Sequence, residues 1–223
     1  MESVTGREAF RETAEAAPSG ARVPVEVRVA VDDPFEAYRR ARTGPGGVFL
    51  ETTGGQAGWG YFATEPEQRL RVGAAAVVKE RTTGAAEDGG RDDVATAAAR
   101  SPTLSTLAGL LAQETLARGD CDVPFPCGWF GWLSYDVARE LESLPETTDD
   151  DRDLPQLQAG LYDCVAAWEE PRDGETTLRI TACPRVESDA DLDAVYDRAS
   201  ARARDLAERA REGAGGDERA PAR

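Results

Sequence analysis

Five valines at alternate positions constrain the fold of this chain more than any other feature. Charged or small residues separate them, so that the pattern repeats every two residues. Side chains of a β-strand alternate between the two faces of its sheet, and this period therefore predicts a half-buried strand. The residues concerned are Val23, Val25, Val27, Val29 and Val31.

Further strands are expected in pairs joined by short turns. A Gly-Gly step follows the first strand of one pair, and a Pro-Arg-Asp-Gly turn lies inside the other. Apolar or β-branched runs on both sides of such turns are typical of antiparallel hairpins. The expected strands cover 48–52 and 59–63, 157–168 and 176–183, and, as single strands, 70–78 and 130–134.

Helices are expected at irregular places between these strands. Asp33 is a good N-cap and Pro34 suits the first helical position, so a helix begins there with Phe35, Tyr38 and Ala41 facing inward. Other helices are expected over 7–17, from 102 to Gly119, after Ser134, and over 189–211. Their expected buried residues are Leu104, Leu107 and Leu111, then Val137 and Leu141, then Leu192, Val195, Ala199, Ala203, Leu206 and Ala210.

Strand pairs with irregularly placed helices favour an α+β fold over a doubly wound parallel one. We expect mostly antiparallel sheets in a two-layer, sandwich-like arrangement with flanking helices. No repeat or linker divides the sequence, so one domain is expected over 23–212. An N-terminal segment over 1–22, a surface loop over 82–100 and a disordered tail over 213–223 complete the prediction.

Acidic residues dominate the charge of the chain. Asp and Glu total 42 against 26 Lys and Arg, which gives a formal net charge of −16. Carboxylates at this density repel one another, but at about 1 M salt the Debye length is only about 3 Å. The composition indicates a halophilic protein of a salty cytoplasm, or else a negative face that recruits a cationic partner. Nucleic acid is not expected as a partner, because a phosphate backbone requires a basic surface.

Membrane, metal and catalytic signals are all weak. No run approaches the roughly 18 apolar residues of a membrane span, and the polar start is no signal peptide, so a cytoplasmic location is expected. Four cysteines without a C-x-x-C pair, and no histidine, predict free thiols rather than a zinc site. Residues 149–151 are three aspartates, expected as a solvated loop rather than a metal site. Without histidine no Ser-His-Asp or Cys-His pair is possible, and no catalytic residue is predicted.

The stretch from Gly128 to Asp136 reads Gly-Trp-Phe-Gly-Trp-Leu-Ser-Tyr-Asp. It resembles the Gly-Gly-x-x-Gly-Tyr-x-Ser-Tyr-Asp of the amino-terminal domain of component I of anthranilate synthase and aminodeoxychorismate synthase. The segment 48–52 and its following glycine pair resemble the Leu-Leu-Glu-Ser segment of that family. The resemblance extends, in order, over about 23–183.

The resemblance implies a role in chorismate amination. In this family chorismate and Mg²⁺ bind mainly in the carboxy-terminal half, which is expected to lie outside this sequence, so no catalytic or metal residue is carried over. The resemblance therefore implies a non-catalytic chain, inactive by itself. Its expected partners are a separate chorismate-binding catalytic chain and a glutamine amidotransferase subunit.

The family's Leu-Leu-Glu-Ser segment belongs to a tryptophan pocket for feedback inhibition, which implies Leu50, Glu51 and Thr52 as effector-binding residues. Glu51 can accept a hydrogen bond from an ammonium group, and Thr52 keeps a hydroxyl donor. The alternative is a solvated Glu51 and a Thr52 that only suits a strand. The aromatic residues Trp129, Phe130 and Trp132 are expected in core and interdomain packing rather than in ligand binding.

Departures from the family pattern bear on which member this is. Thr52 replaces the usual serine, and the usual Arg-x-Ser is absent near Tyr61. These differences favour aminodeoxychorismate synthase, the enzyme of folate and 4-aminobenzoate synthesis, over anthranilate synthase of tryptophan biosynthesis. A stand-alone module that binds an aromatic ligand, and a truncated reading frame, remain as alternatives.

The acidic composition predicts that folding depends on salt. Raising KCl from low to molar concentration should raise the thermal unfolding midpoint, because screening removes repulsion between carboxylates. Circular dichroism over a KCl series measures this directly. Complete folding at low ionic strength would contradict the halophilic interpretation.

Overall fold

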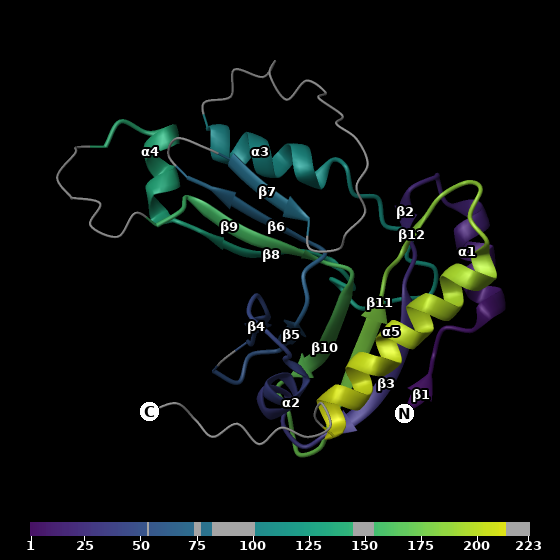
Figure 1. Ribbon diagram of the computed structural model, residues 1–223. Helices are drawn as coiled ribbons and strands as arrows, with labels where there is room; N and C mark the ends of the chain where they lie inside the picture. The colour runs from purple at the N-terminus through teal and green to yellow at the C-terminus, as the bar shows by residue number, and fades with distance from the viewer. Residues whose placement is uncertain (53, 74–76, 82–100, 145–153, 213–223) are drawn as a thin grey trace. The chain divides into compact units, whose positions relative to one another are not determined.

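The computed structural model describes residues 1–52, 54–73, 77–81, 101–144 and 154–212 (Figure 1). The chain divides into two compact units, and it passes from unit 1 to unit 2 and back twice. Unit 1 comprises Met1–Glu65, Thr115–Gly128 and Tyr162–Arg223, and unit 2 comprises Pro66–Glu114 and Trp129–Leu161.

Unit 1 contains a six-stranded antiparallel sheet in the order β1-β3-β11-β10-β5-β4. A two-stranded antiparallel ribbon of β2 and β12 accompanies it. The strands are β1 (Glu2–Ser3), β2 (Ala21–Arg22), β3 (Val25–Val31), β4 (Val48–Leu50), β5 (Gly58–Ala63), β10 (Cys164–Glu170), β11 (Thr176–Ala182) and β12 (Arg185–Val186).

Within the part of the chain that the structure describes, three helices belong to unit 1: α1 (Arg7–Ala16), α2 (Pro34–Ala41) and α5 (Leu192–Glu212). Helix α5 lies along β3 and β11, and both α1 and α2 contact it (Figure 1). The five predicted valines are all buried, and with one stripe of α5 they belong to the main core. Each buried valine contributes about 1.5–3 kcal/mol relative to an exposed one. The α5 stripe is confirmed except for Leu192, which is half-buried.

The start of α2 agrees with the sequence in its cap but not in every buried residue. The Asp33 side chain accepts a hydrogen bond from the Glu36 amide at 2.9 Å, as expected of an N-cap residue. Tyr38 and Ala41 are buried, whereas Phe35, expected inward, is 48% exposed. Its ring lies edge-on to Phe49, with the centroids 5.1 Å apart. The ring therefore rests at the margin of the core.

Unit 2 contains a four-stranded sheet in the order β7-β6-β9-β8. Strand β6 pairs antiparallel with both β7 and β9. A smaller apolar cluster that includes Leu70, Leu110 and Leu157 fills its core. The elements are β6 (Gln68–Val72), β7 (Val77–Arg81), β8 (Gly128–Leu133), β9 (Leu157–Tyr162), α3 (Pro102–Leu111), the 3₁₀ turn η1 (Tyr135–Val137) and α4 (Ala138–Leu141).

Several predicted boundaries are wrong. The run over 70–78 is part of two paired strands, β6 and β7, and the run over 157–168 contains β9 and β10, which belong to different sheets. A continuous apolar run carries no signal for where a strand ends. Helix α3 ends at Leu111 rather than near Gly119. Leu111 and Leu141, expected to be buried, are 52% and 51% exposed.

The fold class is confirmed as α+β with antiparallel sheets. Residues 1–22, expected as a separate segment, contribute β1, α1 and β2 to unit 1. The predicted loop over 82–100, the aspartates 149–151 and the predicted tail over 213–223 lie outside the described residues. Among the described helices, none is both long and apolar enough to cross a bilayer.

Gly131 of β8 lies against the backbone of β9. A Cβ at this position would be 2.1 Å from the Gln158 carbonyl oxygen and 2.5 Å from the Ala159 Cα. Gly131→Ala should therefore destabilise unit 2 by about 1–3 kcal/mol through overpacking. Urea unfolding in molar KCl measures the change in the free energy of unfolding.

The matched control is Gly109→Ala in α3 of the same unit. A Cβ there meets nothing within 4 Å, and alanine suits a helix better than glycine by about 1 kcal/mol. The control should be neutral or stabilising. Equal effects of the two substitutions would contradict the close approach of β8 and β9.

Candidate functional site

The three residues predicted to bind an effector lie at the end of an edge strand of unit 1. Leu50 is the last residue of β4, pairs with Tyr61 of β5 and is 44% exposed. Glu51 follows it and is exposed, and Thr52 is half-buried. Gly54 and Gly55 have φ angles of 82° and 72°, which glycine adopts readily in turns. The predicted Gly-Gly turn is thereby confirmed.

Arg172 connects Glu51 to two other carboxylates. Its Nη2 lies 2.7 Å from Glu51 Oε1, its Nη1 lies 3.0 Å from Asp33 Oδ2, and its Nε lies 3.0 Å from Glu170 Oε1. The side chain of Arg172 is 27% exposed. Three carboxylates around one guanidinium leave an excess of negative charge, and such a site favours a further cation or ammonium group.

The same ion pairs shift the pKa values of this cluster. Burial opposes the charge of Arg172, but Asp33, Glu170 and Glu51 outweigh it and raise its pKa. The pKa of Asp33 is lowered, mainly because its carboxylate accepts the Glu36 amide hydrogen bond, and further by Arg172. Asp33 and Arg172 therefore both stay charged over the neutral range.

Glu170 fixes this cluster to the core. Its Oε1 accepts a hydrogen bond from Trp168 Nε1 at 2.6 Å, and its Oε2 accepts one from the Arg172 amide at 3.1 Å. Trp168 is fully buried and packs against Phe49 of β4, with ring centroids 5.4 Å apart. The buried indole thus holds both β4 and the turn that carries Arg172.

The hydroxyl of Thr52 serves its own hairpin. Its Oγ1 donates a hydrogen bond to the Trp59 carbonyl oxygen at 3.2 Å. A Cβ at Gly58 would lie 2.8 Å from that Oγ1. Thr52 therefore stabilises the β4–β5 connection in this structure, whereas Glu51 and Leu50 present side chains outward.

Sequence reasoning missed Arg172, Asp33 and Glu170 as members of this site. Arg172 was noticed only as part of a turn and Asp33 only as a helix cap. The sole available signal was an arginine in a turn next to an acidic residue, Glu170, in a chain where acids outnumber bases. Contacts between residues more than 100 positions apart are not visible in such a pattern.

All four cysteines are free, and Cys164 and Cys183 are buried. Burial raises the pKa of Cys164 to about 12, so its thiol stays protonated and unreactive. Over the described ranges no three His, Cys, Asp or Glu side chains are grouped to hold a metal ion. These described residues therefore offer no grouped set of ligands for Mg²⁺.

The Gly128–Asp136 motif has structural roles in the described residues of unit 2. The Ser134 Oγ accepts a hydrogen bond from the Asp136 amide at 3.2 Å and so caps η1. Trp129 packs against the unit 2 core. Trp132 is 41% exposed and Tyr135 is 99% exposed. Trp129 therefore packs in the core as predicted, and interdomain packing of Trp132 stays a prediction.

Known proteins that are similar to this chain bear related names. Over 205 residues the chain is 54% identical to anthranilate synthase component 1 3 of Haloarcula marismortui. The matched region covers 92% of this chain and 37% of that protein. It is 52% identical to anthranilate synthase component 1 1 of the same organism, over 96% of this chain and 39% of that protein. Aminodeoxychorismate synthase component 1 of Escherichia coli is 30% identical over 46% of this chain and 23% of that protein. No family model matches the chain.

The chain belongs to the anthranilate synthase and aminodeoxychorismate synthase component 1 family. It corresponds to the amino-terminal part of these component 1 proteins and spans less than two fifths of the length of the two Haloarcula relatives. The predicted resemblance is confirmed. The halophilic character inferred from the composition also fits the Haloarcula relatives.

The Asp33–Arg172 pair predicts a stability difference that depends on pH. The pKa of Asp33 lies below its ordinary value of 3.8. The Asp33 carboxylate therefore adds to the free energy of unfolding at pH values above 3.8, and this stabilisation is lost as the pH falls through the lowered pKa. Asp33→Asn keeps a capping oxygen and should cost about 0.5 kcal/mol at neutral pH, since the pair is partly exposed.

Two comparisons make this test specific. Asp33→Ala also removes the cap and should cost about 1 kcal/mol more. Urea unfolding from neutral pH into the acid range, at the lowest salt that keeps the chain folded, measures both variants. A difference in the free energy of unfolding between Asp33→Asn and the parent chain that stays the same in acid would contradict a contribution from the ion pair.

Proposed function

We propose that this chain is the amino-terminal, non-catalytic part of an anthranilate synthase component 1. The observation that carries this proposal is the 54% identity over 92% of the chain to a Haloarcula protein of that name. The reaction would be the amination of chorismate to anthranilate. Chorismate and Mg²⁺ would bind to the part of component 1 that this chain does not span.

Aminodeoxychorismate synthase remains the second candidate. Thr52 and the missing Arg-x-Ser near Tyr61 favoured it at the level of sequence. Relatives of that name match about half of this chain or less, with 30% identity over 46% and 34% over 45%. Coverage and identity are both higher for anthranilate synthase, and we therefore prefer it.

The proposed role gives the chain two partners. One is the chorismate-binding part of component 1, present either as a separate chain or as a further segment. The other is a glutamine amidotransferase that supplies ammonia. The name component 1 supports the existence of at least one further component for these relatives.

In this proposal Leu50 and Glu51 form part of a tryptophan effector site. The excess negative charge of Asp33, Glu51 and Glu170 around Arg172 suits the ammonium group of an amino acid. Leu50, 44% exposed beside it, offers an apolar contact. Thr52 would support the hairpin that presents Glu51, because its hydroxyl is bound to Trp59.

A chimera tests the proposed function. This chain would replace the corresponding part of the Haloarcula anthranilate synthase component 1, and ammonia-dependent product formation would be assayed in molar KCl. We expect anthranilate, detected by its fluorescence. A folded chimera that forms no anthranilate would overturn the proposal.

The effector site has a separate readout in the same chimera. Glu51→Gln should raise the tryptophan concentration for half-inhibition about tenfold, because a charge-assisted hydrogen bond is lost, and should leave the uninhibited rate unchanged. Glu36→Gln, an exposed acid paired with Arg39 on α2, is the matched control. An active chimera insensitive to tryptophan would refute the effector site and leave the family role intact.

A further inference from the structure

The second face of the six-stranded sheet in unit 1 carries charged residues that the proposed function does not use. Strand pairing places Glu2, Arg28, Arg179, Ala167, Tyr61 and Leu50 in one row across all six strands. Direct partners in such a row share a face of the sheet. Arg28 of β3 and Arg179 of β11 are therefore adjacent.

A buried carboxylate holds these two arginines together. Glu26 is 2% exposed, and its Oε1 accepts hydrogen bonds from Nε of Arg28 and Nε of Arg179, both at 2.8 Å. Its Oε2 accepts a further bond from Arg179 Nη2 at 3.0 Å. Like charges directly opposite each other destabilise a sheet, and a buried ion pair is costly to desolvate. Packing alone gives no reason for this arrangement.

Glu26 binds the Nε side of each guanidinium and leaves outer donors free. Over the described residues, no hydrogen bond reaches either Nη of Arg28 or Nη1 of Arg179. Arg179 also pairs with Asp122, a side chain that is 78% exposed, and its guanidinium lies over the Trp59 ring at 5.6 Å. Arg179 is thus fixed in position before any ligand arrives.

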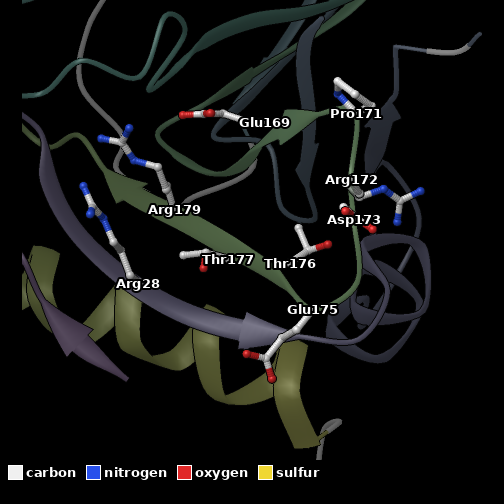
Figure 2. Close-up of a pocket in the computed structure, with 9 residues that line it drawn as sticks. All are labelled: Arg28, Glu169, Pro171, Arg172, Asp173, Glu175, Thr176, Thr177 and Arg179. Atoms are coloured by element: carbon white, nitrogen blue, oxygen red, sulfur yellow. The ribbon is translucent and has the colours of Figure 1, made fainter. Parts of the chain in front are cut away.

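These donors line a pocket of about 380 Å³ on the same face. Figure 2 shows the guanidinium groups of Arg28 and Arg179 and the carboxylate of Glu169 directed toward the same side. Arg172 also lines the pocket, but its guanidinium points away from them, toward the carboxylates of the effector site. Thr177 adds a hydroxyl to the lining.

We infer that this pocket binds a small zwitterion of the α-amino acid type, with its carboxylate on Arg28 and Arg179 and its ammonium on Glu169. Guanidinium groups match the planar geometry of a carboxylate, and a fixed pair of them is preorganised for it. Glu169 repels a simple anion but accepts an ammonium group. A neutral zwitterion also avoids the general repulsion of anions by a chain of net charge −16.

Calorimetric titration of the whole chain in molar KCl tests this site. The first set of probes is the standard L-amino acids. The second set is the amide and the α-hydroxy acid of the amino acid that binds best. Arg28→Gln should weaken binding about tenfold or more, because it removes charge-assisted donors. Both analogues should also bind more weakly, since each lacks one charged group. Binding of none of the amino acids would overturn the inference.

Three further variants make the outcome specific. Arg198→Gln, the same charge change at an exposed position of α5, should leave binding unchanged. Glu169→Gln should weaken binding of the amino acid but not binding of its α-hydroxy acid. Glu51→Gln should leave this binding intact. Loss of binding in Glu51→Gln without loss in Arg28→Gln would place the ligand at the effector site and refute the second site.

Folding of the variants is verified by their thermal midpoints. Arg28 is the preferred position because its side chain is 38% exposed and its removal leaves Glu26 bound to Arg179. Unchanged affinity in a folded Arg28→Gln chain would overturn the inference.

Discussion

The alternation of side chains along β3 and β11 is the constraint on which unit 1 depends. One set of residues, the valines with Leu178 and Ile180, faces α5 and forms the core. The other set brings Glu26, Arg28 and Arg179 together on the opposite face. A shift of register by one residue would exchange the two faces, and it would bury Arg28 under α5. The packing of the core therefore also sets the geometry of the charged face.

The guanidinium of Arg172 plays a comparable part at the edge of the sheet. It joins the turn after β10 to the end of β4 and to the cap of α2 through Glu51 and Asp33. These contacts hold the proposed effector residues in place and surround one positive group with more negative charge than it neutralises. In molar salt such exposed pairs are weakened by screening, whereas Glu170, anchored to the buried Trp168, is less accessible to ions.

The most recognisable motif of the sequence and the proposed effector residues lie in different units. Gly131 and Ser134 of the motif shape β8 and the following turn in unit 2. Glu140, just after the motif, accepts hydrogen bonds from the Ser101 hydroxyl and from the amide and hydroxyl of Thr103 at the start of α3. Family likeness is thus carried here largely by residues that build the scaffold, while the charged groups available to ligands come from unit 1.

The sequence by itself determined the α+β class, the valine strand β3, the Asp33 cap, the hairpin of β10 and β11, the stripe of α5 and the family. Each follows from a local rule of period, cap or turn, or from an ordered set of motifs. Only the tertiary structure decided that β9 and β10 belong to different sheets, that Phe35 and Leu141 are exposed, and that Arg172 meets Glu51. The same holds for the pairing of Arg28 with Arg179 through Glu26. The physical reason is that these features depend on contacts between segments far apart in the chain, and local sequence patterns carry no information about which distant segments will meet.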